Sequence, residues 1–382
     1  MPTVYTKDVI ENLFDGYWYR EPTSKWFTET VTISKTDVNR EGKRKKLFIA
    51  IDTDTWHLGS GNQGIYAGWT DTHTIVTTFQ HKIDGVIAQK PIPSLDENIP
   101  QFITKNTYEV IQILGNYVYE KFTGKMIAIT GTAGKSTSKN LLNHILTNFD
   151  SVIATRGNHN TRTGVPLTIA CAVSNPNYLV VESAVSGLWM KQGGILKDYP
   201  PNVALITSID GGQAKNAYET AKLKARVAEG MNNVGTVIIN KETKEFDVLK
   251  ESVERYNENI LTYGIDDTCD SFLIDYKELQ SEAKVQVQIL GEKVTFTTYL
   301  LGKAMAQNII GVLTVLKHWN FPLQEVIPFV ETYKPAEGIQ TFERVSLPNG
   351  KQCTMLDDSW NATGIAMVET INLFGRQAPY YS

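Results

Sequence analysis

A glycine-rich turn between an apolar strand and an amphipathic helix is the feature that most constrains how this chain can fold. The turn is ITGTAGKST at residues 129–137; the apolar run MIAIT (Met126–Thr130) leads into it, and a helical pattern of apolar residues follows. Backbone N–H groups at the start of such a helix can hold phosphate oxygens. Lys135 could then pair with the β- and γ-phosphates, and Ser136 could reach Mg²⁺. The turn therefore predicts a phosphate-binding loop; the alternative is a tight strand–helix turn with a surface lysine.

Strands and helices alternate after this loop, which predicts a mostly parallel sheet. The runs YLVVE (Tyr178–Glu182), VALITSI (Val203–Ile209) and GTVIIN (Gly235–Asn240) have the length and apolar content of buried strands, with helical stretches between them. Strands connected in this way lie parallel and are covered by helices. KVQVQI and KVTFTTYL, which flank LGE, predict a small antiparallel hairpin beside the sheet. We expect an α/β fold with a central domain of the P-loop type.

The chain divides into an N-terminal domain, a central domain and a C-terminal remainder. LFIAID (Leu47–Asp52) and GVIAQKP (Gly85–Pro91) predict buried strands in an N-terminal α/β domain. We place this domain at residues 1–122, the central domain with the phosphate-binding loop at 123–340, and the C-terminal remainder at 341–382.

Charge and cysteine content exclude several classes of function. The chain has 37 Lys and Arg against 41 Asp and Glu, so its net charge of −4 provides no basic field for nucleic acid or an anionic membrane. Its three widely spaced cysteines form neither a disulfide framework nor a paired-cysteine zinc site. No run approaches the roughly 18 apolar residues of a membrane helix, and we expect no secretory signal, because MPTVYTKDVIENLF lacks a basic region followed by a long apolar run. We therefore expect a cytoplasmic protein that acts on small molecules. The basic run at residues 43–46 is either a solvated turn or a contact with an anionic substrate.

A series of segments in order along the chain resembles the Mur ligases, the family that adds amino acids or peptides to the cell-wall precursor. Besides ITGTAGKST, these segments are GNHNTRTGVPLTIA, VVES, ITSI, LKARVAEGM, GKAMAQN and LDDSWNA. GNHNTRTGVPLTIA and LDDSWNA are most similar to the branch that adds the terminal dipeptide. The stretches KLFIAID and IYAGW are weakly similar to the uridine-nucleotide-binding domain of the family. The resemblance covers nearly the whole chain.

The resemblance implies that residues 1–122 bind substrate, that residues 123–340 bind ATP and a metal ion, and that residues 341–382 form a hinge and the start of a further domain. The residues that would hold ATP are Gly131, Thr132, Ala133, Gly134, Lys135, Ser136, Thr137, Asn308 and Asp358. Glu182, with Ser136, would bind Mg²⁺, and a carboxylate at the carboxyl end of a parallel strand suits a hard cation on chemical grounds too. The alternative for Glu182 is a surface carboxylate at a strand end.

The resemblance also implies a carbamylated lysine and a substrate-facing loop. Lys224 would carry the carbamate, with Lys222 as the alternative; an exposed lysine without this role is the other possibility. In GNHN and the residues after it, Asn160, Arg162 and His159 would contact substrate, and an arginine can hold a carboxylate through two hydrogen bonds. A histidine in a loop is more often a hydrogen-bonding surface residue.

The chain departs from the family pattern at several positions. Gln213 is the nearest counterpart of a histidine that follows ITNI in the family, so it is the candidate for a second metal ligand. Arg226 stands where the family usually has glutamate, and Ile339 where it has a nucleotide-contacting arginine. Ala304 and Met305 replace a histidine and an asparagine of GxHNxxN.

About 20 residues follow LDDSWNA, whereas the third domain of the family would need roughly 100–150 residues. We leave open a natural short form, a fragment, and a third domain that a second chain supplies.

The function we expect is ATP-dependent formation of an amide bond between a carboxylate and an amine through an acyl phosphate. ATP and Mg²⁺ would be the cofactors, and a loop, a lysine and a cation are what such phosphoryl transfer requires. The substrate would be a cell-wall-precursor-like or specialised peptide. One alternative is a non-catalytic or partner-dependent module that binds nucleotide or precursor. Another alternative is a different P-loop phosphotransferase.

Overall fold

The computed structural model describes residues 4–60, 68–210, 214–359 and 364–377. The chain forms two compact units, and each is built from two stretches of sequence. The first comprises Met1–Lys125 and Ser151–Val181, and the second comprises Met126–Asp150 and Glu182–Ser382. The domain boundaries at about residues 122 and 340 stay predictions.

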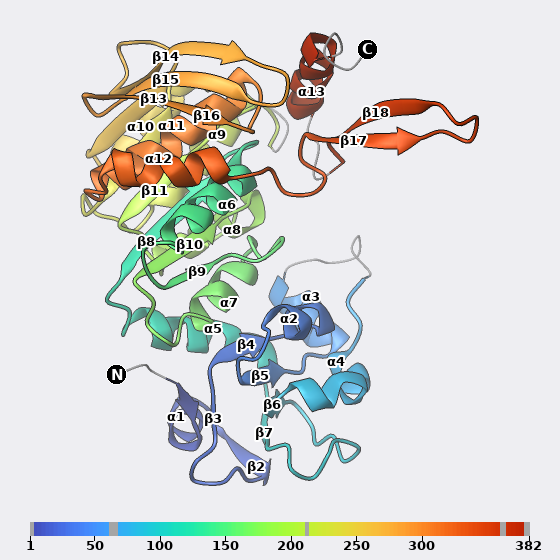
Figure 1. The fold of residues 1–382 in the computed structure, drawn as a ribbon. Coiled ribbons are helices and arrows are strands. Elements are labelled where there is room, and N and C mark those ends of the chain that lie inside the picture. Colours follow the sequence, from blue (N-terminus) through green and yellow to red (C-terminus); the bar gives the residue numbers. More distant parts are fainter. Residues whose placement is uncertain (1–3, 61–67, 211–213, 360–363, 378–382) are drawn as a thin grey trace. The chain divides into compact units, whose positions relative to one another are not determined.

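The first unit contains a five-stranded sheet in the order β2-β7-β6-β5-β4 (Figure 1). Its strands are β2 (Gly16–Arg20), β4 (Thr30–Thr32), β5 (Lys46–Ile49), β6 (Gly85–Ala88) and β7 (Gln101–Thr104). Strands β4 to β7 run parallel, and β2 is antiparallel at one edge. Two further pairs lie in the described part of this unit: β1 (Tyr5–Thr6) with β3 (Phe27–Thr28), and β9 (Val152–Ala154) with β10 (Tyr178–Glu182).

Short helices accompany these strands, and buried aliphatic and aromatic side chains form the core. The helices are α1 (Lys7–Leu13), α2 (Lys35–Arg40), α3 (Thr53–Ser60), α4 (Thr72–Ile75), η1 (Val76–Lys82), α5 (Thr107–Tyr119) and α7 (Gly164–Ala170). Phe48 of β5 and Phe79 of η1 meet edge to face, with ring centroids 5.3 Å apart, inside this core. Burial of such side chains is the main favourable term in folding.

Part of the basic run at residues 43–46 is structural rather than solvated. Lys43 is exposed, but Lys46 is buried and its Nζ donates to the carbonyls of Gly42 and Arg44 at 2.8 and 2.7 Å. Arg44 pairs with Glu41 at 3.2 Å. Two of the four cations therefore fix the turn before β5.

The second unit contains strands in the order β16-β15-β14-β13-β12-β11-β8. They are β8 (Lys125–Thr130), β11 (Val203–Ile206), β12 (Thr236–Asn240), β13 (Ile260–Gly264), β14 (Ser271–Glu278), β15 (Ala283–Ile289) and β16 (Glu292–Thr298). The pairs from β8 to β14 are parallel, and β14, β15 and β16 are antiparallel. The expected α/β class with a small antiparallel part is thus confirmed. β13, which our sequence analysis did not predict, is a half-buried run that lacks a strong apolar pattern.

Helices of this unit include α6 (Lys135–Leu146) after β8, and α11 (Lys303–His318) and α12 (Leu323–Thr332), which pack with it (Figure 1). The others are α8 (Val185–Leu188), η2 (Ile195–Lys197), α9 (Ala217–Ala225), η3 (Arg226–Ala228) and α10 (Phe246–Glu254). A hairpin of β17 (Thr341–Ser346) and β18 (Gln352–Asp357) precedes α13 (Gly364–Gln377).

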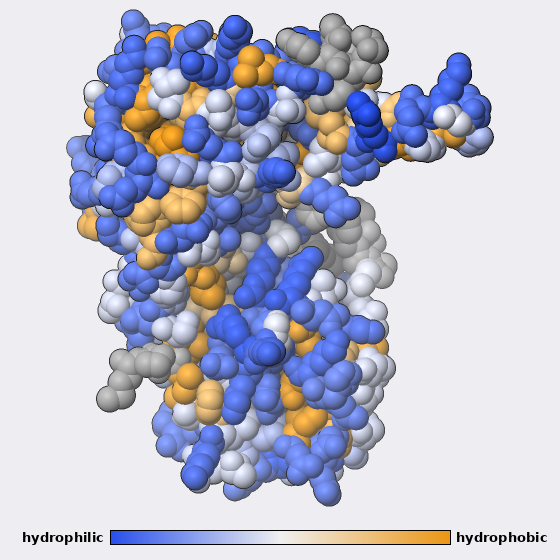
Figure 2. Space-filling view, in the orientation of Figure 1, coloured by the Kyte–Doolittle hydropathy of each residue, from blue (hydrophilic) through white to orange (hydrophobic). Residues whose placement is uncertain are grey.

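Hydrophilic side chains predominate on the face drawn in Figure 2, with apolar side chains in scattered groups. Among the described residues, no helix combines the length and the apolar character that crossing a membrane requires.

A candidate nucleotide-binding site around the glycine-rich loop

The loop between β8 and α6 requires glycine at two positions. Gly131 has φ +149° and Gly134 has φ +85°, and side chains with a Cβ rarely adopt such angles. A Cβ on Gly134 would also lie 2.3 Å from Oδ1 of Asn308, and one on Gly131 would lie 1.9 Å from Oγ1 of Thr207. Thr207 in turn donates to the carbonyl of Ala133 at 2.6 Å. The loop backbone therefore packs closely against Thr207, which follows β11, and against Asn308 of α11.

Lys135 begins α6 and is folded back over the loop. Its side chain is buried, and Nζ donates to the carbonyl of Thr132 at 3.0 Å. Burial lowers the pKa of Lys135 from its ordinary value, although the negative charge of Glu182 partly opposes this shift. This lysine lies where the sequence predicts a phosphate-binding cation, and the hydrogen-bond acceptor found for it among the described residues is a neutral carbonyl.

Glu182 and Ser136, which we predicted as metal ligands, are in direct contact. Glu182 ends β10 and is only 1% exposed. Ser136 donates its hydroxyl to Glu182 at 3.0 Å from Oε2 and 3.2 Å from Oε1. Lys139 places its Nζ 3.6 Å from Oε2 of the same carboxylate. The sequence analysis did not identify Lys139.

Lys224 faces the same site from α9. The residue is fully buried, and its Nζ has no hydrogen-bond partner among the described residues. Burial lowers the pKa of Lys224 well below its ordinary value, the charge of Lys135 adds to this effect, and Glu182 opposes it. Lys222, the alternative, instead lies over the ring of Tyr218, with Nζ 4.0 Å from the centroid. The register of α9 therefore favours Lys224 as the lysine of the site.

A cavity of about 370 Å³ opens beside the loop, within the range of about 300–1,000 Å³ that ligand pockets usually have. Predicted ATP-site residues 132–137, Asn308 and Asp358 line it; Gly131 adjoins it in the chain. Asp358 accepts a hydrogen bond from the backbone N–H of Gln340 at 3.2 Å. Lining residues that sequence reasoning missed include Asn240 and Gln307, joined by a 3.0 Å hydrogen bond, as well as Glu242 and Lys244. No local pattern marks these four, because they come from two segments far apart in the sequence, residues 240–244 and α11.

Metal ligands in this site are limited to a few groups. Ser136 and Glu182 provide oxygen atoms, whereas Gln213 lies outside the described residues. Within the described part of the chain, no three histidine, cysteine, aspartate or glutamate side chains gather as a metal centre. A cation here would therefore need further oxygen atoms from a ligand, which is how Mg²⁺ commonly binds with nucleotides.

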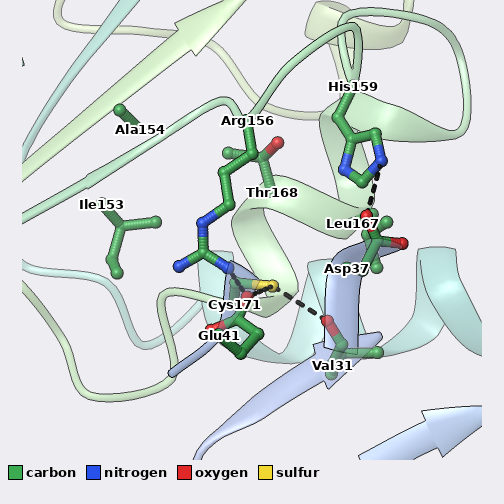
Figure 3. A pocket seen from close by; sticks show the side chains of 10 residues that line it. All are labelled: Val31, Asp37, Glu41, Ile153, Ala154, Arg156, His159, Leu167, Thr168 and Cys171. Carbon is green, nitrogen blue, oxygen red and sulfur yellow. Dashed lines mark hydrogen bonds and ion pairs between the residues drawn. The ribbon is translucent and has the colours of Figure 1, made fainter. Parts of the chain in front are cut away.

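The predicted substrate residues lie in the first unit, before α7. His159 is paired with Asp37, with 3.1 Å between Nε2 and Oδ1 (Figure 3). Burial works to raise the pKa of Asp37, but its contacts with His159 and Ser34 hold it below the ordinary value. Arg162 has a buried Nε that lacks a hydrogen-bond partner in the described chain, and Asn160 is half-buried. Arg162 is thus the one of the three with unused donor capacity at a buried atom.

The residues around the small cavity beside His159 stabilise the first unit and leave no room for a substrate. Arg156 reaches into it and pairs with the buried Glu41, and Cys171 lies on the same side (Figure 3). Its volume of about 20 Å³ has room for about one water molecule. The ion pairs of Glu41 and Asp37 therefore fix this part of the first unit, and the cavity is too small for a substrate.

Comparison with known proteins shows that this chain is similar to the Mur ligases. Residues 129–316 match the model of the Mur ligase middle domain. A UDP-N-acetylmuramoyl-tripeptide--D-alanyl-D-alanine ligase of Synechocystis is 28% identical over 355 residues, which cover 91% of this chain and 73% of that protein. The ligase of the same name from Buchnera aphidicola (strain Bp) is 23% identical over 286 residues, which are 74% of this chain and only 60% of that protein.

Solved structures share the fold at low sequence identity. MurF from Acinetobacter baumannii has a TM-score of 0.75 at 20% identity, covering 99% of this chain and 78% of its own. MurF ligase from Thermotoga maritima in complex with ADP has a TM-score of 0.67 at 20% identity, covering 91% and 75%. A folylpolyglutamate synthase of Mycobacterium tuberculosis, complexed with ADP and AMPPCP, reaches 0.55 at 15% identity, covering 71% and 70%.

Proposed function

The chain belongs to the Mur ligase family, and we propose that it is an ATP-dependent ligase that joins a carboxylate to an amine. The observation that carries this proposal is the group of charged and polar side chains, most of them buried, around the glycine-rich loop. Lys135, Ser136, Glu182 and Lys224 converge beside a cavity of nucleotide size. The activity, substrates and partners of the whole protein are part of the proposal, since the chain spans 60% of the Buchnera relative.

ATP would bind with its phosphates on the loop. The N–H groups at the start of α6 and the ammonium of Lys135 are the groups that can hold phosphate oxygens there. Asn308 and Asp358 would contact the rest of the nucleotide from the other walls of the cavity. Relatives of this fold that were solved with ADP support this use of the cavity.

Mg²⁺ fits the residues present, and Ser136 and Glu182 would hold it. The chemistry that the ion supplies is neutralisation of phosphate charge, which lowers the barrier to phosphoryl transfer. The Nζ of Lys224, which has no hydrogen-bond partner among the described residues, supports a carbamylated lysine as a further part of the site. As a neutral amine, it could add to CO₂ through a new N–C bond and lose a proton, so that a carbamate supplies oxygen atoms where the amine has no partner. Gln213 stays a proposal as a second metal ligand.

The chain's own residues would stabilise each transfer. A substrate carboxylate oxygen attacks the γ-phosphorus, ADP leaves, and an acyl phosphate forms. The amine nitrogen then attacks the acyl carbon, phosphate leaves, and the nitrogen loses a proton. Lys135 would balance the negative charge on the transferred group. The carboxylate would come from a cell-wall-precursor-like or specialised peptide, for which Asn160, Arg162 and His159 are the proposed contacts.

A binding module without catalysis is the second candidate, and one feature of the cavity favours it. Ile339, Ala304 and Met305 line the cavity with groups that carry no charge, where the family has an arginine, a histidine and an asparagine. Fewer polar contacts with nucleotide would follow from this composition. A different P-loop phosphotransferase is disfavoured by the match to the Mur ligase middle domain. A second chain that supplies a further domain and a cytoplasmic location both stay proposals.

The first test is a calorimetric titration of the purified chain with Mg²⁺ and a non-hydrolysable ATP analogue. We expect saturable binding that Lys135→Ala weakens at least about tenfold, or about 1.4 kcal/mol. Lys250→Ala is the matched control, since this lysine lies on the surface of α10. Equal affinity in wild type and Lys135→Ala would contradict the assigned loop. Binding without phosphate release when carboxylate and amine substrates are supplied would favour the binding module.

A further inference from the structure

Three lysines and one carboxylate share a buried region of the second unit. Lys135, Lys139 and Lys224 are 6%, 5% and 0% exposed, and Glu182 is 1% exposed. Removing a charge from water costs several kcal/mol unless a partner compensates it. Among the described residues of this group, lysines outnumber carboxylates three to one, so Glu182 cannot compensate a protonated form of each lysine.

The three lysines differ in the partners of their Nζ atoms. Nζ of Lys135 donates to a loop carbonyl, and Nζ of Lys224 has no hydrogen-bond partner in the described chain. Nζ of Lys139 forms an ion pair with Glu182 and lies 3.6 Å from its Oε2 atom. It follows Lys135 by four residues on α6, so both side chains lie on the same helical stripe.

Stability alone gives little reason for a lysine at this position. Leu142 and Leu146 continue the stripe of Lys139 along α6, and both are fully buried. A buried ion pair often adds nothing over well-packed apolar side chains of similar size. An apolar residue would therefore serve packing equally well, whereas only a cation changes the electrostatic potential at Glu182.

We propose that Lys139 is a built-in counter-cation of Glu182 that makes divalent-cation binding at this carboxylate depend on nucleotide. The inference rests on the proposed function, in which Glu182 is a metal ligand. Without phosphates, an incoming cation would meet a carboxylate that Lys139 already neutralises, and like charges at this distance repel strongly where little water screens them. The phosphates of a nucleotide add enough negative charge to offset that repulsion. Lys139 is thus a positioning residue, and it need not contact substrate.

The test measures cation binding in the absence of nucleotide, with Mn²⁺ as the probe and its free electron-paramagnetic-resonance signal as the readout. Wild type should bind Mn²⁺ weakly alone and at least about tenfold more tightly when ADP is present. Lys139→Met, which keeps the length of the side chain but removes its charge, should bind Mn²⁺ without ADP at least about tenfold more tightly than wild type. A residue with only a packing role would lose stability when replaced and would gain no cation affinity.

Matched variants separate the possible results. Lys139→Arg retains the charge and should behave as wild type, and Lys250→Met, which breaks a surface pair with Glu254, should too. Adding Glu182→Gln to Lys139→Met should abolish the gained affinity, which locates the cation at this carboxylate. If Lys139→Met does not fold, as judged by circular dichroism, Lys139→Gln replaces it.

Two results would overturn the inference: tight Mn²⁺ binding by wild type without ADP, or a folded, ADP-binding Lys139→Met whose affinity for free Mn²⁺ equals that of wild type. Failure of wild type to bind Mn²⁺ even with ADP would instead contradict the proposed function.

Discussion

At the scale of single residues, burial distinguishes the two lysines that the sequence offers as candidates for carbamylation. Lys222 and Lys224 lie two positions apart on α9, and the sequence alone leaves both open. In the structure Lys222 covers an exposed tyrosine ring, while Lys224 is buried and its Nζ has no hydrogen-bond partner in the part of the chain that the structure describes. A helix turns by about 200° over two residues, so only one of the two can face the interior.

Carbamylation of Lys224 is testable by isotope labelling. Burial lowers the pKa of Lys224, which increases the share of the neutral amine, the form that reacts with CO₂. Protein equilibrated with ¹³C-bicarbonate near pH 8 should show one carbamate resonance by ¹³C NMR. We expect Lys224→Met to lose this resonance and Lys222→Met to keep it. A resonance that survives in Lys224→Met would assign the modification elsewhere.

At the scale of elements, the local pattern could predict the loop and most strands, but not the contacts that hold them. The glycines, Lys135 and Ser136 were predictable because strand, turn and helix follow one another directly. Glu182 was predictable as the end of an apolar run. Our sequence analysis did not identify Lys139. Its position could have been noticed, because Lys139 lies on the same side of the helix as the buried Leu142, and a buried lysine needs a partner that compensates its charge. Side-chain contacts between distant segments, such as Asp37 with His159, leave no local pattern.

The close approach of Asn308 to the loop leads to a prediction for Gly134. In Gly134→Ala the new Cβ would overlap Oδ1 of Asn308, and the backbone would keep an unfavourable φ of +85°. We expect a loss of about 1–3 kcal/mol in the free energy of unfolding, measured by urea denaturation, together with weaker nucleotide binding.

Gly291→Ala is the matched control, since φ is +86° there too and nothing lies within 4 Å of the added Cβ. The loss in the free energy of unfolding of Gly291→Ala therefore measures the effect of the backbone angle alone. Equal losses in the two variants, with unchanged nucleotide affinity in Gly134→Ala, would show that the contact with Asn308 is unimportant.

At the scale of the whole molecule, the two units are interleaved in sequence but carry different predicted tasks. Residues 151–181 leave the second unit and fold with the first, taking the substrate loop with them. The glycine-rich loop, Glu182, Lys224 and Asn308 all belong to the second unit, although more than 170 residues separate the first from the last. The nucleotide site is therefore complete within one unit, as far as the predicted residues go.

This arrangement predicts where nucleotide stabilises the chain. A ligand that binds only the folded state adds about 2.7 kcal/mol of stability at a concentration of 100 Kd. Hydrogen exchange measured by mass spectrometry with and without Mg²⁺ and ADP should slow in peptides from 130–146, 203–225 and 303–318. Peptides from the first sheet, such as 85–104, should change little, because no predicted nucleotide contact lies there. Lys135→Ala should remove the protection at equal ligand concentration. Protection centred on 85–104 would place the nucleotide in the first unit and contradict the assigned site.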